Sequence, residues 1–253
     1  MDSLAASGNR FVLSSRYTAR ALRLLRDRSS RFEVIHMPAL TAKDTLDMLG
    51  RAGGHLSTDV PEDEYTARTV QALADGRPIY VRALADELIG MRERGGPGGH
   101  DAVSALAALM STQGRLSRQC EFSYELRLHR ARGYGALKAI LEILAEEEGL
   151  TLTEISHRLQ RTPGSTKDYL SWLEDVDLVT SRQKRYSFTD PVLRLWVRLH
   201  CHPVPPTEED VAREIQHYAL GRLPSPDASP VLAYAGVEAT VDERKSWGII
   251  EID

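Results

Sequence analysis

The sequence has little cysteine, no long apolar run and no excess of positive charge, and each shortage excludes a class of protein. Two cysteines in 253 residues, Cys120 and Cys201, cannot build a disulfide framework or a four-thiolate metal site. No apolar run approaches the roughly 18 residues of a spanning helix, and the first residues have no apolar stretch typical of an export signal. We therefore expect a cytoplasmic protein that does not enter a membrane.

The charge balance also excludes a protein that is basic as a whole. Lys and Arg number 32 against 36 Asp and Glu, which gives a net charge of −4. No global positive field would draw such a chain to nucleic acid or to an anionic membrane, so any such contact needs a local patch. Apolar residues make up 42% and charged residues 27% of the chain, as in ordinary globular proteins.

The first 50 residues are typical of strands that alternate with helices. Arg10–Arg16 is a short apolar run that ends in small polar residues, which predicts a buried strand entering a loop. After a helix over Tyr17–Arg28, the segment Arg31–Met37 predicts a second strand. Thr41 is placed to cap a following helix, with Asp44 at its third position.

Helical periodicity dominates the next 80 residues. Two helices are predicted between Pro61 and Arg94, separated by the turn Asp75–Pro78. Gly95–Gly99 contains four glycines and a proline, which can continue neither a helix nor a strand. Two further helices, Asp101–Met110 and Leu116–Arg130, are predicted beyond this break.

Residues 134–199 carry the most organised pattern. A helix that ends at Gly149 precedes a short helix, for which Thr151 or Thr153 is the N-cap. A turn at residues 162–165, a third helix and a hairpin with a basic tip follow. This order predicts a winged helix-turn-helix, and a generic three-helix bundle is the alternative. Beyond it, prolines punctuate the chain around one predicted helix, Thr207–Leu220.

The order of these elements resembles the C-terminal half of an ATPase of the STAND branch of the AAA+ P-loop proteins, with a lid followed by a winged helix. The resemblance covers roughly Asn9 to Arg198 and rests on four stretches in the family's order. These look like the sensor-1 strand, the last strand with the lid entry, the Gly-x-Pro turn of the lid, and the end of the winged helix: Phe11–Arg16, Phe32–Leu40, Gly76–Pro78 and Tyr186–Trp196.

The resemblance implies a mainly α protein with the remnant of a P-loop α/β sheet. Residues 1–50 would hold two strands of that sheet, 51–131 the helical lid, 132–202 the winged helix, and 203–253 a C-terminal helix and an irregular tail. The complete family member binds ATP and Mg²⁺. Arg16 would read the γ-phosphate, and the turn Gly76, Arg77 and Pro78 would border the base. Asp190 corresponds to the second residue of a His-Asp pair that contacts the diphosphate in some relatives, where this chain has Thr189-Asp190.

The sequence departs from the family in two decisive respects. It contains no Gly-x-x-x-x-Gly-Lys-Ser/Thr string, the loop that holds the phosphates, and no apolar strand with paired acids to hold Mg²⁺. We therefore expect a truncated, split or decayed ATPase that does not hydrolyse ATP alone and binds no cofactor tightly. Its expected partner is a P-loop segment or another protein, and the two lone strands predict self-association.

The alternative function is that of a winged-helix DNA-binding regulator, and a structural interaction module built on the helical region is a third. Lys167 on the third helix and Arg182, Lys184 and Arg185 at the wing tip are the candidate nucleic-acid contacts. Residues 133–202 carry nine Lys and Arg against ten Asp and Glu. Asp168 and Glu174 on the third helix also disfavour DNA, so we expect at most weak duplex binding and favour an intramolecular or protein–protein role.

Several candidates also have plain structural interpretations. Arg16 could be a surface residue at a strand end, and Pro78 a proline at the first position of a helix. Asp190 followed by Pro191 is typical of a helix N-cap. The eight histidines are scattered without ligand spacing, so the sequence predicts no metal site.

Overall fold

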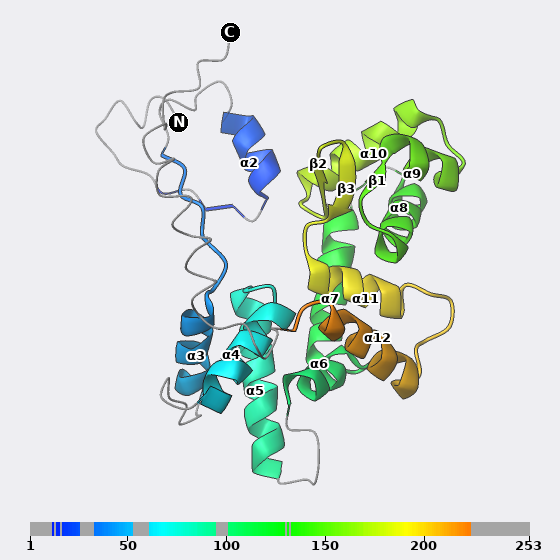
Figure 1. The fold of residues 1–253 in the computed structure, drawn as a ribbon. Helices are drawn as coiled ribbons and strands as arrows, with labels where there is room; N and C mark the ends of the chain where they lie inside the picture. Colours follow the sequence, from blue (N-terminus) through cyan, green and yellow to red (C-terminus); the bar gives the residue numbers. More distant parts are fainter. Residues whose placement is uncertain are drawn as a thin grey trace.

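The computed structural model describes residues 12, 14–15, 17–25, 33–52, 61–94, 101–129, 131 and 133–223. The first predicted strand, Arg16, the glycine-rich break Gly95–Gly99 and the tail beyond Leu223 fall wholly or mainly outside these residues. The described part is mainly helical with one small sheet (Figure 1). Its elements, in chain order, are α2 (Thr18–Leu25), α3 (Ala42–Arg51), α4 (Pro61–Leu73), α5 (Pro78–Arg94), α6 (Ala102–Met110), α7 (Arg115–Leu128), α8 (Tyr134–Glu146), β1 (Leu150–Thr151), α9 (Leu152–Leu159), α10 (Pro163–Asp175), β2 (Val179–Arg182), β3 (Arg185–Phe188), α11 (Pro191–His200) and α12 (Glu208–Leu220).

Local capping chemistry explains where three of the helices begin. Thr41, Thr151 and Thr207 each accept a hydrogen bond from the backbone N–H three residues later, and an acid at that position bonds back to the threonine N–H. Such capping boxes satisfy two otherwise free donors of the first turn. The predicted caps Thr41 and Thr151 are confirmed.

The winged helix is confirmed as well, with one strand that the sequence did not predict. The helices α8, α9 and α10 are followed by the antiparallel hairpin β2–β3, and the two-residue strand β1 pairs with β3 to complete a sheet of order β1-β3-β2. In the register, Leu150 lies opposite Tyr186, and Val179 lies opposite Phe188. The hairpin closes at Gln183 and Lys184.

The prediction of a strand over Arg31–Met37 is wrong for the residues that the structure describes. Residues 33–40 form neither helix nor strand, and the side chains of Val34 and Ile35 are 47% and 76% exposed. A strand requires a neighbour to accept and donate its backbone hydrogen bonds. No described segment lies beside these residues as a strand, so their apolar side chains stay unburied.

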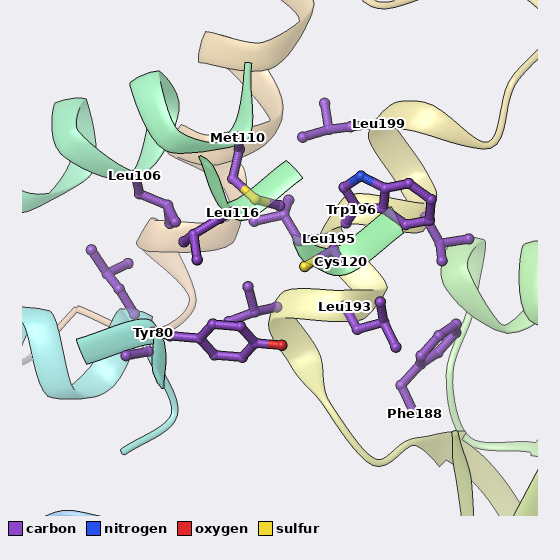
Figure 2. Close-up of a cluster of buried hydrophobic side chains, with 14 of the residues drawn as sticks. Tyr80, Leu106, Met110, Leu116, Cys120, Phe188, Leu193, Leu195, Trp196 and Leu199 are labelled. Atoms are coloured by element: carbon purple, nitrogen blue, oxygen red, sulfur yellow. The ribbon is translucent and has the colours of Figure 1, made fainter. Parts of the chain in front are cut away.

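One continuous hydrophobic core joins the helices α3–α7, which we call the helical region, to the winged helix. The helix α11, which directly follows the wing, sends Trp196 against Tyr124 of α7, with ring centroids 5.3 Å apart. Trp196 Nε1 donates to Ser117 Oγ at 3.2 Å, and Leu193 and Leu195 bury beside it (Figure 2). Because α11 belongs to both parts, the winged helix is anchored to the helical region by apolar packing.

The same packing determines which side of the winged helix is free of contact with α4, α5 and α6. The helices α11 and α12 contact α7 and α6, whereas α9, α10 and the hairpin extend away from α4, α5 and α6 (Figure 1). The side of the winged helix that carries α10 is therefore not covered by α4, α5 and α6, and α2 packs against the C-terminal end of α10.

Candidate functional site

The turn between α4 and α5 has a backbone that only glycine accommodates without strain. Gly76 has φ +61°, and a Cβ there would lie 2.8 Å from the carbonyl oxygen of Leu40. The Leu40 N–H donates to the Gly76 carbonyl at 2.7 Å, so the turn holds the segment that leads into α3. Pro78 is the first residue of α5, where the missing N–H has no cost. Gly76 and Pro78 thus both have structural roles.

Asp190 is the buried N-cap of α11 and the centre of a polar cluster. Its Oδ1 accepts hydrogen bonds from the N–H groups of Val192 and Leu193 at 3.0 and 3.1 Å. Asp190 as a whole is only 5% exposed. The Tyr80 hydroxyl donates to Oδ2 at 2.7 Å, and Arg77 Nη1 lies 3.6 Å from the same oxygen. Burial, and then the Asp190 charge, raise the pKa of Tyr80, so the phenol stays protonated and donates.

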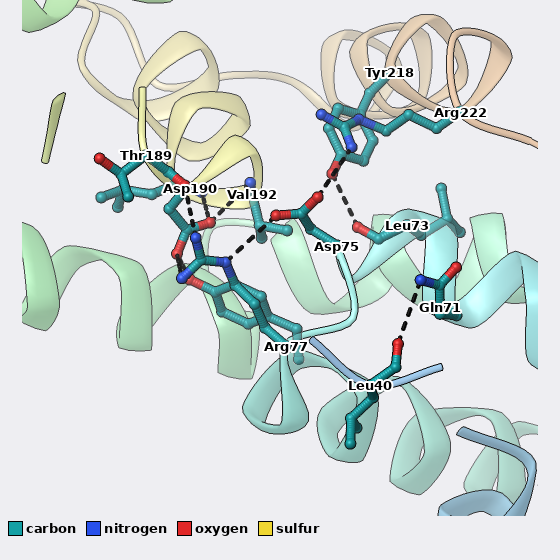
Figure 3. A network of polar contacts seen from close by, with 12 residues as sticks. Leu40, Gln71, Leu73, Asp75, Arg77, Thr189, Asp190, Val192, Tyr218 and Arg222 are labelled. Carbon is teal, nitrogen blue, oxygen red and sulfur yellow. Dashed lines mark hydrogen bonds and ion pairs between the residues drawn. The ribbon is translucent and has the colours of Figure 1, made fainter. Parts of the chain in front are cut away.

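Arg77 completes the connection between the turn and the winged helix (Figure 3). Its Nη2 donates to the carbonyl oxygen of Thr189 at 2.6 Å, and its Nε lies 3.6 Å from Asp75. Asp75 also lies 3.7 Å from Arg222, just beyond the end of α12. The structure therefore brings together four of the five predicted nucleotide contacts, Gly76, Arg77, Pro78 and Asp190, while Arg16 lies outside the described residues.

Tyr80 is the member of this cluster that sequence reasoning missed. It lies in the first turn of α5, where its spacing from Arg77 predicts only a neighbouring position on the helix. Its partner is 110 residues away in the sequence, so no local pattern could indicate the bond.

The described residues of this cluster do not form an anion site by themselves. The Arg77 side chain is partly exposed, but its Nε is buried and lies 3.6 Å from Asp75, so that atom is closed to an added group. The carboxylates of Asp75 and Asp190 already offset its charge. A triphosphate would therefore need its main contacts from a phosphate-binding loop, which this sequence lacks.

A second candidate site is the uncovered side of the winged helix, which carries four exposed cations. Arg161 lies in the turn before α10, Lys167 on α10, and Arg182 and Lys184 at the wing tip. Their side chains make no hydrogen bond or ion pair with any described residue, and we call them the duplex-facing cations. The fourth predicted contact, Arg185, is already engaged, since its Nη1 donates to the Gly149 carbonyl at 2.7 Å.

The acids of the winged helix are placed differently from the sequence expectation. Glu174 and Asp175 lie at the C-terminal end of α10, next to α2, where Arg23 forms an ion pair with Asp175. Glu174 is half-buried, and burial raises its pKa. At the end of α8, Glu147 and Glu148 pair with Arg158 and Arg194. Among the described residues, most of the acidic charge of the winged helix is thus paired or lies away from the exposed face of α10, and Asp168 is the unpaired acid on that face.

The wing tip has an unusual backbone. Gln183 and Lys184 both have positive φ, 51° and 63°, as a two-residue hairpin turn with the favoured twist requires. Asn-Gly is the usual sequence for such a turn, because other residues are strained in this region. The backbone strain that exposes Lys184 at the tip therefore lowers the free energy of unfolding.

Comparison with known proteins supports the fold of this part of the chain. Residues 136–180 match the family described as winged helix-turn-helix DNA-binding. This region is a winged helix. No curated protein and no solved structure matches the chain.

Two other kinds of site have no support within the described residues. None of the described helices is long and apolar enough to cross a membrane. In the same part of the chain, no three His, Cys, Asp or Glu side chains gather where they could hold a metal ion.

Proposed function

We propose that this chain is the lid and winged-helix part of a nucleotide-dependent switch of the STAND type. The observation that carries the proposal is the bond between Tyr80 and Asp190, with Arg77 beside it. The family resemblance places the lid turn and the end of the winged helix at one nucleotide, although they lie 110 residues apart. In the structure they are in direct contact, as one shared site would need.

The roles of this chain's residues follow from that arrangement. Arg77 would be the residue of this cluster that reaches a nucleotide, since its side chain is partly exposed. Asp190 and Tyr80 would hold Arg77 and the start of α11 in place. ATP and Mg²⁺ would be held mainly by a P-loop segment supplied from elsewhere, so the chain alone would not hydrolyse ATP.

The shared core favours movement of the lid and the winged helix as one rigid unit. Trp196 and its neighbours bind α11 into the helical region, so the lid and the winged helix would move together when a nucleotide closes the site. We include in the proposal that this movement exposes or hides a surface that binds a partner protein.

Reading the DNA upstream of the Met1 codon is the first test. The proposal predicts a Gly-x-x-x-x-Gly-Lys-Ser/Thr loop and an apolar strand with paired acids, in frame or separated by a stop codon, or in a neighbouring gene. If these regions encode no such elements, and no P-loop protein co-purifies with the chain, the proposal is wrong.

The second candidate function is duplex DNA binding, which the family match and the four duplex-facing cations favour. Exposed Lys and Arg side chains that have no partner among the described residues are available to phosphates. With few such contacts, we expect nonspecific affinity near or weaker than micromolar at physiological salt.

A gel-shift and fluorescence titration series tests this second function. We expect the triple variant of Arg161, Arg182 and Lys184 to alanine to weaken duplex binding and to lower the salt dependence by about one unit per lost contact. A matched control removes three exposed cations of the helical region, Lys43, Arg51 and Arg92, and should retain binding. Equal effects of both triple variants would show that binding is not made by the winged helix.

A further inference from the structure

We infer that Lys167 and Asp168 make the winged helix selective for a G·C base pair, read in the major groove. The inference rests on the duplex binding proposed as the second function and names the feature of the duplex that this helix would recognise. It depends on three observations: the position of the two residues on α10, their lack of partners, and the chemistry of their side chains.

The two residues lie on the uncovered face of α10. Gly164, Lys167, Asp168 and Ser171 are spaced by three or four residues, so they share one face of the helix, and Thr166, Leu170 and Leu173 bury the opposite face. In helix-turn-helix proteins the second helix enters the major groove, and residues of its N-terminal half contact base edges. Lys167 and Asp168 lie at the fifth and sixth positions of this helix.

Neither side chain has a bonding partner in the part of the chain that the structure describes. Lys167 and Asp168 are exposed and form no ion pair or hydrogen bond with any described residue, although cations and acids elsewhere on the winged helix do pair. Among the described residues, Asp168 therefore has no structural partner that explains it. The four duplex-facing cations outnumber this one carboxylate on the uncovered side, so a phosphate backbone can still approach.

The chemistry of the two groups is complementary to one base pair. In the major groove guanine presents two acceptors, O6 and N7, which suit Lys, whereas cytosine presents the N4 amino group, which can donate to Asp. Thymine presents an acceptor, O4, and a methyl group there, so a carboxylate that faces it would be repelled and left without a partner. Adenine does present an amino donor, N6, but its adjacent N7 acceptor repels a carboxylate, and thymine opposite offers Lys one acceptor where guanine offers two. Asp168 would thus select by rejection as well as by attraction.

Selection from randomised duplexes with the full chain tests the inference, followed by titration of the selected site and single-position variants. We expect wild-type protein to prefer a G·C pair at one position by about tenfold over A·T. Asp168→Ala should abolish this preference without weakening nonspecific binding, because it removes a negative charge. Asp168→Asn should shift the preference toward adenine, since an amide matches the N6 and N7 groups of that base.

The controls separate the inference from the proposal on which it rests. Asp47→Asn removes an exposed acid from α3 and should leave the selected site unchanged, and circular dichroism checks that each variant is folded. If the wild-type chain binds no duplex, both duplex binding and the inference are wrong. If it binds but selects no G·C pair, or if Asp168→Asn selects the same base as wild type, the inference alone is overturned.

Discussion

Single polar residues connect parts of this chain that are far apart in the sequence. Asp190 was identified as a candidate from the family resemblance, and its local use as an N-cap follows from the Asp-Pro pair. Its bonds to Tyr80 and its ion pair with Arg77 could not be predicted, because they depend on how α5 packs against α11. The residues of the site were thus predictable from motifs, whereas their contacts were not.

The hydrogen bond from Tyr80 should contribute measurably to stability. We expect Tyr80→Phe to lower the free energy of unfolding by about 1–2 kcal/mol, because it leaves the buried Asp190 carboxylate without one of its donors. Urea unfolding followed by circular dichroism measures the change. Tyr65→Phe is the control, since Tyr65 is exposed, and an equally large loss in that variant would contradict the explanation.

At the scale of the elements, prediction succeeded where local chemistry decides the structure. Thr41 and Thr151 cap their helices through bonds that span three residues. The strand β1 was missed because its two residues are defined only by pairing with β3. The strand expected over Arg31–Met37 required neighbours, and its apolar pattern alone could not provide them.

The residues at the wing tip should lower the stability of the protein and strengthen its binding to duplex DNA. We expect the double variant Gln183→Asn and Lys184→Gly to raise the free energy of unfolding by about 1 kcal/mol, because it relieves two positive φ angles. The same variant should weaken duplex binding, because it removes a cation. Thermal unfolding and a duplex titration are measured together, and a variant that is destabilised or binds more tightly would contradict this account of the tip.

The capping box of α9 predicts a pH dependence. Bonds from Thr151 lower the pKa of Glu154 below its ordinary value of 4.5. A carboxyl group whose pKa is lower in the folded state stabilises the protein above its unfolded pKa, and this contribution is lost as the pH falls through the folded value. We therefore expect Glu154→Gln to be less stable than wild type at pH 7 and equally stable near pH 3. A difference that persists unchanged at pH 3 would contradict this cause.

At the scale of the whole molecule, the helical region and the winged helix share one core through α11. The expected mainly α fold with a winged helix is confirmed, while the division at residues 50, 131 and 202 stays a prediction. We expect the two parts to unfold in one transition, because separating them would expose Trp196, Leu193 and Leu195.

A large-to-small substitution in the core tests whether the helical region and the winged helix unfold together. Trp196→Ala should lower the free energy of unfolding by about 3–5 kcal/mol, through lost burial and the cavity that remains. Hydrogen exchange should report the loss in α7 and in α8 alike. Faster exchange confined to one of these helices would show that the parts are stable separately.

Titration of Mg-ATP tests the proposed switch most directly. It compares the chain alone, the chain supplemented with the P-loop segment encoded upstream or in a neighbouring gene, and the same mixture with Arg77→Ala. We expect the chain alone to bind more weakly than about 10 μM, the mixture to bind measurably, and Arg77→Ala to weaken that binding about tenfold. Tight binding by the chain alone, or equal binding by the wild-type and Arg77→Ala mixtures, would contradict the account.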